Sequence, residues 1–220
     1  MKICGVRSLE EARAAIDAGA DALGFNFWPK SPRFIAPEAA SDIIAALPPL
    51  IASIGVFVNE DRERILDIAS QAGLNAVQLH GDETPDFCAS LGQAKIIKAL
   101  RVGENFDPNQ IEKYAVSAVL LDTKIKGSYG GTGRRFDWSV AREASRRAPI
   151  ILAGGLTIEN VAEAIRQVAP MAVDVCSGVE AEPGRKDLNK LKMFMDEVAR
   201  ANAELNFSVV CGPLSVVEKN

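Results

Sequence analysis

A helix is predicted to end and a strand to begin within Ala18-Gly19-Ala20-Asp21-Ala22-Leu23, and the same order recurs at Ala72-Gly73-Leu74-Asn75-Ala76-Val77. In each stretch the glycine stands just past the helical pattern. Many helices end there in a left-handed conformation, which glycine adopts without steric penalty. An apolar run follows each glycine. Two copies of this junction indicate a chain assembled from repeated α/β units.

Short apolar runs and helical patterns alternate from one end of the chain to the other. Eight strands are expected, at Lys2–Gly5, Ala22–Phe27, Ala52–Val58, Ala76–His80, Lys95–Leu100, Ala118–Asp122, Ile150–Ala153 and Ala172–Val175. Helices are expected at Leu9–Ala18, Pro37–Leu47, Asp61–Ala72, Thr84–Leu91, Pro108–Tyr114, Trp138–Arg147, Ile158–Val168 and about Asp187–Ala203. The first helix follows Ser8, and Glu11 three residues later completes a capping-box pattern.

Strict alternation of strands and helices requires parallel strands joined by right-handed crossovers. Eight such units in about 200 residues predict an α/β fold, a single-domain (β/α)8 TIM barrel. The barrel is expected over residues 1–203, with a C-terminal tail of unknown structure at 204–220. A doubly wound open sheet is the alternative. Its dinucleotide-binding form is weakened because no Gly-x-Gly-x-x-Gly follows the first strand.

The composition of the chain argues against several classes of binding partner. The net charge of −4 argues against nucleic-acid binding, which normally needs a basic surface. No apolar run approaches the roughly 20 residues of a membrane span, and no signal pattern opens the chain, so a cytoplasmic protein without membrane contact is expected. The four cysteines form no Cys-x-x-Cys pair and are expected as free thiols. A single histidine excludes a histidine-rich metal site.

Several polar side chains fall where predicted strands end, the edge at which barrel enzymes build their active sites. Cys4 ends the first strand, Arg33 follows the second in a proline-containing loop, His80 ends the fourth and Asp122 ends the sixth. A thiol and a carboxyl group can serve as base and acid, and an arginine fork suits a carboxylate or phosphate. Taken alone, Cys4 and His80 also fit structural residues, and Arg33 fits a solvated loop.

Glycine-rich loops are expected after the sixth, seventh and eighth strands. The loops after the last two strands form the recurrent phosphate site of this fold, where backbone amides hold the anion. The candidate binding residues in the three loops are Gly131, Gly154, Gly155, Asp174, Ser177 and Gly178. Together with the thiol, the carboxyl group and the arginine, they predict proton transfer on a phosphorylated small molecule, without naming the substrate.

Several motifs resemble those of the phosphoribosylanthranilate isomerases of tryptophan synthesis. They occur in order from Lys2 to about Val198. The motifs are Lys2-Ile3-Cys4-Gly5, Gly24-Phe25-Asn26-Phe27, Pro29-Lys30-Ser31-Pro32-Arg33, Gly55-Val56-Phe57-Val58-Asn59, Val77-Gln78-Leu79-His80-Gly81, Leu121-Asp122-Thr123, Gly130-Gly131-Thr132-Gly133, Phe136-Asp137-Trp138, Ala153-Gly154-Gly155-Leu156 and Val173-Asp174-Val175-Cys176-Ser177-Gly178-Val179-Glu180.

The resemblance implies a (β/α)8 barrel without cofactor or metal, acting as a monomer or homodimer. It implies the Amadori rearrangement of N-(5′-phosphoribosyl)anthranilate to 1-(2-carboxyphenylamino)-1-deoxyribulose 5-phosphate. Asp122 would be the general acid and Cys4 the general base. Arg33 would hold the anthranilate carboxylate, and backbone groups near Gly154, Gly155, Ser177 and Gly178 would hold the phosphate.

Two alternative functions remain to be weighed, and one residue differs from the usual family sequence. The related sugar isomerase of histidine synthesis has carboxylates at both catalytic strand ends, so Cys4 favours the tryptophan enzyme. A non-catalytic barrel would be expected to lack Cys4, Asp122 or Arg33. The family usually has serine where this chain has Cys176. Because the eighth strand of a closed barrel pairs with the first, Cys176 and Cys4 are expected to be neighbours that oxidation links.

Overall fold

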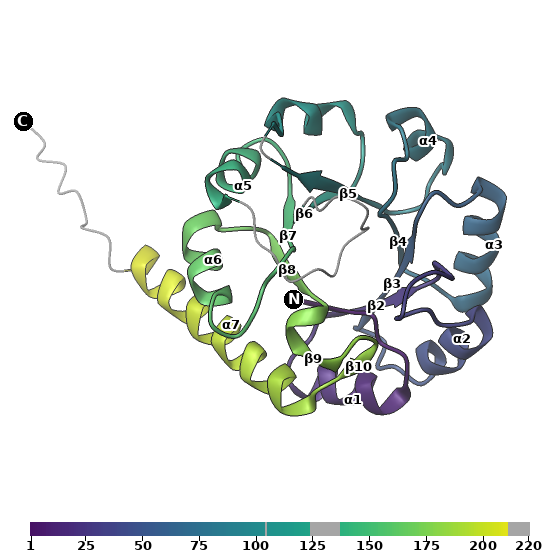
Figure 1. Ribbon diagram of the computed structural model, residues 1–220, viewed down its shortest axis with the longest axis horizontal. Helices are drawn as coiled ribbons and strands as arrows, with labels where there is room; N and C mark the ends of the chain where they lie inside the picture. The colour runs from purple at the N-terminus through teal and green to yellow at the C-terminus, as the bar shows by residue number, and fades with distance from the viewer. Residues whose placement is uncertain (104, 124–136, 211–220) are drawn as a thin grey trace, which may run out of the picture.

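Eight parallel strands form a closed barrel in the computed structural model, which describes residues 1–103, 105–123 and 137–210 (Figure 1). The strands are β1 (Lys2–Cys4), β2 (Ala22–Asn26), β3 (Ala52–Phe57), β4 (Ala76–Leu79), β5 (Ile96–Val102), β6 (Ala118–Thr123), β7 (Ile150–Leu152) and β8 (Ala172–Val175). Each strand pairs with the next in the chain, and β8 closes on β1. The predicted fold class and all eight strands are confirmed.

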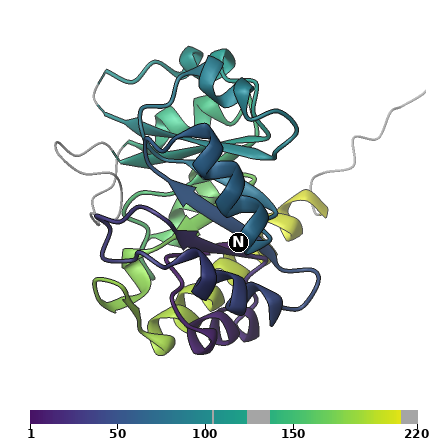
Figure 2. The same cartoon turned by 90° about the vertical axis from the view of Figure 1, so that its right-hand side faces the viewer.

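Helices surround the strands on the outside of the barrel (Figures 1 and 2). The α-helices are α1 (Leu9–Asp17), α2 (Pro37–Ala45), α3 (Arg62–Ala72), α4 (Pro85–Ser90), α5 (Trp138–Ala144), α6 (Val161–Val168) and α7 (Leu188–Val210). Half of the expected capping box is present: the Ser8 side chain accepts a hydrogen bond from the Glu11 amide, but the Glu11 carboxylate accepts from the Arg7 amide rather than from the Ser8 amide. Gly73 ends α3 with a φ of 69°, the left-handed conformation expected from its position.

Five elements differ from expectation: two 3-10 helices, the two strands of a hairpin, and the last helix at its C-terminal end. Pro108–Lys113 is a 3-10 helix, η1, rather than an α-helix, which suits so short a segment. A second 3-10 turn, η2 (Ser177–Val179), and a hairpin of β9 (Glu180–Glu182) and β10 (Arg185–Lys186) were not predicted. The last helix does not end near residue 203 but continues to Val210, so the tail expected at 204–220 begins inside α7.

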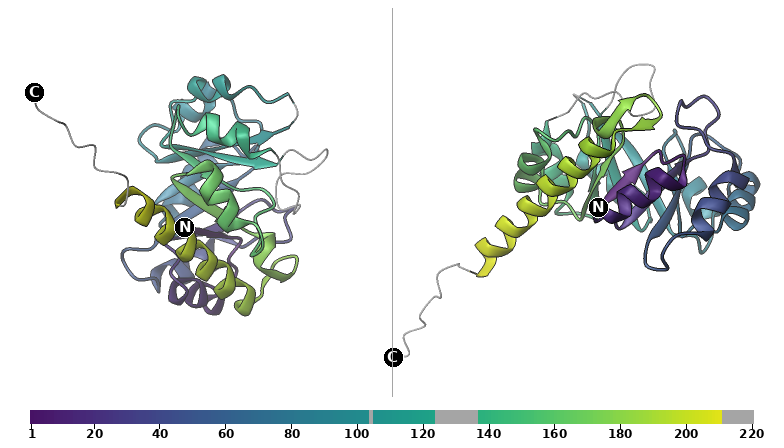
Figure 3. Two further views of the ribbon diagram at one scale, coloured as in Figure 1. Left: turned by 90° about the vertical axis from the view of Figure 1, so that its left-hand side faces the viewer. Right: turned by 90° about the horizontal axis from the view of Figure 1, so that it is seen from below.

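Helix α7 lies on the outside of the barrel against α1 and α6, and its C-terminal end extends past the strands (Figure 3). It thereby covers the side of the barrel where the first and last strands meet. In the part of the chain that the structure describes, no helix has the length and apolar content needed to cross a bilayer.

The interior of the protein contains two clusters of apolar side chains and several buried charged groups. The larger cluster lies between the strands and the helices, and the smaller is made of residues such as Ile54, Leu120 and Ile151 on barrel strands. Lys2 and Lys98 are also buried. Buried charges require partners, and each lysine has a carboxylate beside it. Lys2 Nζ lies 2.9 Å from Asp174 Oδ1, and Lys98 Nζ lies 2.7 Å from Glu83 Oε2.

Candidate active site

A pocket of about 650 Å³, which includes space open to solvent, lies among residues at and just beyond the C-terminal ends of the strands. Every predicted site residue within the described part of the chain lines it: Cys4, Arg33, His80, Asp122, Gly154, Gly155, Asp174, Ser177 and Gly178. Gly131 lies outside the described residues. Residues distant in sequence therefore meet at one edge of the barrel, as the strand ends predicted.

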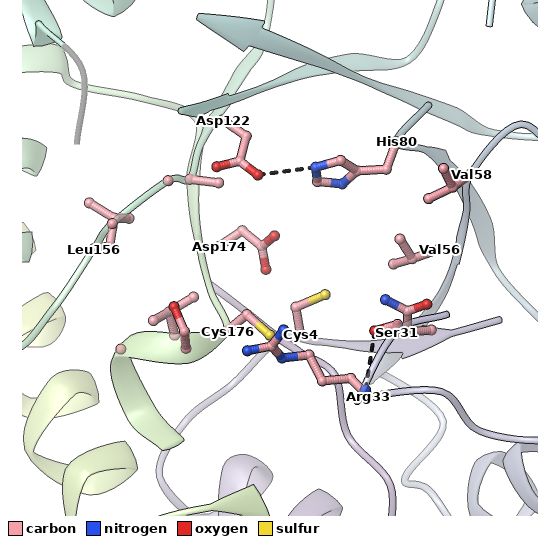
Figure 4. Close-up of a pocket in the computed structure, with 17 residues that line it drawn as sticks. Cys4, Ser31, Arg33, Val56, Val58, His80, Asp122, Leu156, Asp174 and Cys176 are labelled. Atoms are coloured by element: carbon pink, nitrogen blue, oxygen red, sulfur yellow. Dashed lines mark hydrogen bonds and ion pairs between the residues drawn. The ribbon is translucent and has the colours of Figure 1, made fainter. Parts of the chain in front are cut away.

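The pocket has two facing walls (Figure 4). Asp122 and His80 lie on one side, while Cys4, Cys176 and Arg33 lie on the other, with Asp174 between them. A small molecule bound in the middle would therefore have a carboxyl group on one side and a thiol on the other.

Cys4 ends β1 and is 8% exposed. Its sulfur fits because Gly24 lies beside it on β2, where a Cβ atom would come within 2.9 Å of Sγ. A hydrogen bond from Cys176 holds the pKa of Cys4 well below its usual range, and the ammonium groups of Lys2 and Lys186 lower it further, although burial opposes them. The thiolate needed for a base is therefore stabilised before any ligand binds.

Cys176, the neighbour of Cys4, has the opposite tendency and favours its protonated form. Its hydrogen bond to Cys4 and its own burial raise the pKa of Cys176 well above the usual range. Cys4 is thus the more acidic member of the pair, and the single proton of Cys176 has two acceptors within reach, Cys4 and Glu180 Oε1 at 3.7 Å.

Lys2 and Asp174 lie below this pair, inside the barrel. Burial raises the pKa of Asp174 to about 6, although the Lys2 ammonium opposes the rise. Burial acts to lower the pKa of Lys2, but the charges of Asp174 and Cys4 outweigh it and raise that pKa above its ordinary value. Lys2 therefore stays positively charged beneath the Cys4 thiolate.

Asp122 is held at the end of β6 by its own backbone and by a histidine. Its Oδ1 accepts a hydrogen bond of 2.7 Å from the Thr123 amide, and its Oδ2 lies 3.1 Å from His80 Nε2. The Gln78 amide donates to His80 Nδ1 at 2.9 Å, so a neutral His80 carries its proton on Nε2, toward Asp122. His80 thus donates to the Asp122 carboxyl group and orients it at the edge of the pocket.

The loop that presents His80 is fixed by a buried ion pair. Lys98 Nζ donates to the carbonyls of Leu79 and Gly81 and to the Glu83 carboxylate, which uses all three of its protons. Glu83 also accepts from the amides of Asn59 and Gly81. This network leaves neither charge unpaired and holds the chain on both sides of His80.

Arg33 already has a carboxylate partner within the protein. Its Nε and Nη2 donate to the two oxygens of Glu180 at 2.9 and 2.7 Å. These bonds use two of the five guanidinium N–H groups, and the other three have no partner among the described residues. The fork is therefore oriented by Glu180 with donors left for a ligand.

Glu180 and Lys186 are site residues to which the sequence analysis assigned no role. Lys186 Nζ lies 3.2 Å from Glu180, 3.1 Å from the Cys176 carbonyl and 3.8 Å from Cys176 Sγ. Burial acts to raise the pKa of Glu180, yet Arg33 and Lys186 hold it below its ordinary value. The signals in the sequence were the motif that ends at Glu180 and the position of both residues just after the eighth strand, near Pro183-Gly184, which makes the turn of the hairpin.

The glycines after β7 and β8 allow close backbone approaches. A Cβ at Gly154 (φ 79°) would lie 2.5 Å from the Thr123 nitrogen and 2.7 Å from Asp122 Oδ1, and one at Gly178 would lie 2.0 Å from the Leu156 carbonyl oxygen. The loop after β7 is further fixed by Asn160, which accepts from the Thr157 amide and donates to the Gly155 carbonyl. Gly154 is therefore needed to make room for Asp122 as well as for a ligand.

The described residues contain no group of three or more histidine, cysteine and carboxylate side chains that could hold a metal ion. The pocket holds the acidic Cys4 thiol on one wall, the hydrogen-bonded Asp122 and His80 on the facing wall, and the Arg33 guanidinium to one side. A (β/α)8 barrel with this site is an enzyme of the class that moves protons on a small anionic substrate.

The comparisons with known proteins give the family. The family model for N-(5′-phosphoribosyl)anthranilate isomerase matches residues 1–197, and the chain belongs to this family of tryptophan-biosynthesis isomerases. The family member from Trichlorobacter lovleyi is 51% identical over 202 residues, which cover 91% of this chain and 98% of that protein.

Solved structures agree. The Thermotoga maritima phosphoribosylanthranilate isomerase has a TM-score of 0.85 and 46% identity, over 90% of this chain and 98% of that chain. A further isomerase structure, with a TM-score of 0.82, 45% identity and coverage of 90% and 97%, holds reduced 1-(o-carboxyphenylamino)-1-deoxyribulose 5-phosphate.

Proposed function

We propose that this chain converts N-(5′-phosphoribosyl)anthranilate into 1-(2-carboxyphenylamino)-1-deoxyribulose 5-phosphate, with Asp122 as general acid and Cys4 as general base. The observation that carries these roles is the placement of the two groups on facing walls of one pocket (Figure 4). Membership in the isomerase family supports the reaction.

The first step is ring opening. Asp122 in its protonated form gives its proton to the ribose ring oxygen as the bond to C1′ breaks, while His80 Nε2, 3.1 Å from Oδ2, holds the carboxyl group in place. The nitrogen lone pair of the anthranilate moves to C1′ and gives an iminium ion. Its positive charge then acidifies the proton on C2′.

The second step is proton removal. The Cys4 thiolate takes the C2′ proton, and the electrons move to the iminium nitrogen to give an enol that becomes the ketone. Lys2 and Lys186 stabilise the thiolate beforehand, so the base does not have to lose a proton first. Holding both ends of the substrate fixes C2′ beside Cys4, and such positioning can contribute several kcal/mol.

Substrate binding is shared between two sides of the pocket. Arg33, oriented by Glu180, offers its remaining donors to the anthranilate carboxylate. The backbone near Gly155, Ser177 and Gly178 binds the phosphate, as loops after the last two strands commonly do in this fold. We also infer that the chain works in the cytoplasm as a monomer or homodimer. A Thermotoga maritima relative is dimeric.

The acid and base roles are tested by following the decay of the substrate's anthranilate fluorescence after the enzyme is added to freshly made substrate. Cys4→Ala and Asp122→Asn are each expected to lower kcat by about 10²- to 10⁴-fold while the far-UV circular dichroism stays unchanged. Cys88→Ala, which removes a buried thiol on α4, is the control and is expected to keep the wild-type rate. A near-wild-type rate in either site variant would refute that residue's role.

A further inference from the structure

We propose that Cys4 and Cys176 form a dithiol modification site, which hydrogen peroxide converts reversibly into an intramolecular disulfide. The covalent chemistry does not depend on the isomerase activity. The accompanying loss of activity rests on the proposed role of Cys4 as base.

The barrel brings the two residues together where its ends meet. Strands β1 and β8 pair with Lys2 opposite Asp174 and Ile3 opposite Val175, and the next residues along the two segments are Cys4, the last residue of β1, and Cys176, just past the end of β8. Neighbouring strands lie about 4.8 Å apart, within the Cα separation of roughly 4.4 to 6.8 Å that a disulfide spans. Side chains alternate along a strand, and the Lys2–Asp174 ion pair two residues earlier shows that this face points into the barrel.

The side chains occupy compatible places. Both cysteines line the pocket, and their sulfur atoms lie on the same wall (Figure 4). The space for Cys176 Sγ depends on Gly5, where a Cβ atom would come within 3.2 Å of that sulfur. Neither cysteine is in a disulfide in this structure, and the Cys176 thiol lies within hydrogen-bonding reach of Cys4 and 3.7 Å from Glu180 Oε1.

The first chemical step needs a thiolate and an accessible pocket. The Cys4 thiolate attacks one oxygen of hydrogen peroxide, the O–O bond breaks, and hydroxide leaves. The sulfur is oxidised to a sulfenic acid while the peroxide takes up two electrons. Lys2 and Lys186 favour the thiolate that starts this step.

In the second step Cys176 is the attacking sulfur, and oxidation of Cys4 in the first step makes Cys176 easier to deprotonate. The pKa of Cys176 is raised by its hydrogen bond to Cys4, by burial and by the Cys4 charge, whereas Lys186 and Arg33 lower it. Once Cys4 is a neutral sulfenic acid, the thiolate charge is gone and the two cations remain. The Cys176 sulfur then attacks the Cys4 sulfur, the S–O bond breaks, and water leaves. In total one thiolate, one thiol and one peroxide give one disulfide, one hydroxide and one water.

The chain contains a thiol for comparison. Cys88 lies buried on α4, and burial raises its pKa, so it lacks both the activated sulfur and a neighbouring cysteine on the described elements. Peroxide should therefore modify Cys4 and Cys176 well before Cys88.

The experiment treats the full-length protein with hydrogen peroxide, traps remaining thiols with N-ethylmaleimide under denaturing conditions, and maps the peptides by mass spectrometry. We expect a peptide pair linked through Cys4 and Cys176 and two hydrogens lighter than the reduced pair. Its yield should rise in step with inactivation. Dithiothreitol should remove the link and restore the activity, since two thiol–disulfide exchanges return both thiols.

Two variants decide the assignment, each compared with its own untreated rate. Cys176→Ser should give no linked peptide, and its peroxide inactivation should no longer be reversed by dithiothreitol, because sulfenic acid without a resolving thiol proceeds to sulfinic acid. Cys88→Ala should behave as the wild type does. A wild-type protein without the Cys4–Cys176 link, or a Cys176→Ser protein that recovers as fully as the wild type, would overturn the proposal. Because the link is detected by mass, its absence is distinguishable from a failure of the proposed enzyme activity.

Discussion

Cys4 obtains its acidity from groups that lie far from it in the sequence. The hydrogen bond from Cys176 is the largest cause of the lowered pKa of Cys4. Burial is the next largest and raises that pKa, while the charges of Lys2 and Lys186 lower it. A cysteine with an ordinary pKa near 8.5 is mostly protonated at neutral pH. The reactivity of this residue is thus a property of its neighbours.

Replacing Cys176 by alanine tests that dependence. Because Cys176→Ala removes the hydrogen bond that stabilises the thiolate, the pKa of Cys4 should rise, and the pH midpoint for its alkylation by iodoacetamide should move upward. At neutral pH the alkylation should accordingly become slower. The rate is measured for the Cys4 peptide by mass spectrometry, with the Cys88 peptide of the same sample as reference. An unchanged midpoint would show that the two lysines alone set the acidity.

The orientation of Arg33 gives a second prediction at this scale. Glu180 accepts two bonds from the fork, whereas Glu180→Gln can accept only one from it and leaves Arg33 and Lys186 without their shared negative charge. We expect KM to rise about tenfold, equivalent to about 1.4 kcal/mol, with kcat nearly unchanged. Both constants come from the fluorescence assay.

A matched control lies two residues away. Glu182 is on the same strand, β9, but is exposed and pairs with the exposed Arg185. Surface ion pairs contribute little, so Glu182→Gln should leave KM as it is. An equal rise of KM in both variants would assign the effect to net charge rather than to the fork.

Among the elements, the end of β6 and the start of the loop after β7 depend on each other. Gly154 follows β7 with positive φ, and its backbone lies against Thr123 and Asp122 at the end of β6. The position of the proposed acid is therefore set in part by a residue without a side chain that follows a neighbouring strand.

Gly154→Ala should disrupt this contact. The added methyl would meet the Thr123 nitrogen at 2.5 Å and displace Asp122, and a displacement of about 1 Å can lower kcat about 10²-fold. Gly92→Ala is the control, because Gly92 also has positive φ (69°) but has nothing within 4 Å of the new methyl. That control should lose only about 1 to 2 kcal/mol of stability, measured by urea unfolding, and keep its rate. Equal effects on kcat in the two variants would contradict the steric explanation.

How much of the fold could be predicted varies with the kind of element. The strands were found because buried parallel strands appear as short apolar runs between helical patterns. The hairpin of β9 and β10 has no apolar pattern of its own, and η1 is too short for its period to distinguish 3-10 from α geometry. The end of α7 was misplaced because the pattern past Ala203 was interpreted as a break in the repeat.

The site could be predicted only in part, for a related reason. Strand ends located Cys4, Asp122 and the glycine loops, since the fold itself brings those positions to one edge. The partnership of Glu180 with Arg33 depends on how the hairpin after β8 turns back toward the loop after β2. Such long-range side-chain pairing leaves no local pattern in the sequence.

The whole molecule is closed by a pairing between its first and last strands. Lys2 and Asp174 form a buried ion pair across this junction, separated by 172 positions in the chain. Removing one member of a buried pair typically costs about 3 to 5 kcal/mol, because the other charge is left without a partner.

Lys2→Met should show that cost with a particular pH dependence. Burial already raises the pKa of Asp174 to about 6, and loss of the ammonium raises it further. A carboxyl group whose folded pKa exceeds its unfolded value of about 3.9 stabilises the folded protein below that value, and this stability is lost as the pH rises through the folded pKa. The variant should therefore be closer to wild type in urea unfolding at about pH 5 than at about pH 8.

The second substitution Asp174→Asn supplies the control. In the Lys2→Met/Asp174→Asn protein no buried carboxylate remains at this place, so the difference from Lys2→Met alone should be largest at the higher pH. A deficit in Lys2→Met that does not change with pH would show that lost packing, rather than charge, is responsible.

The junction of β1 and β8 also bears on when the enzyme becomes active during its own synthesis. The proposed base is on the first strand to leave the ribosome, whereas Asp174, Cys176 and Lys186, which balance the charge around it, are on the last strand and just beyond it. A nascent chain that ends before β8 holds the acid and the base but cannot close the barrel around them. We therefore expect catalysis to begin only when translation of the barrel is nearly complete, and chains terminated before β8 to be inactive.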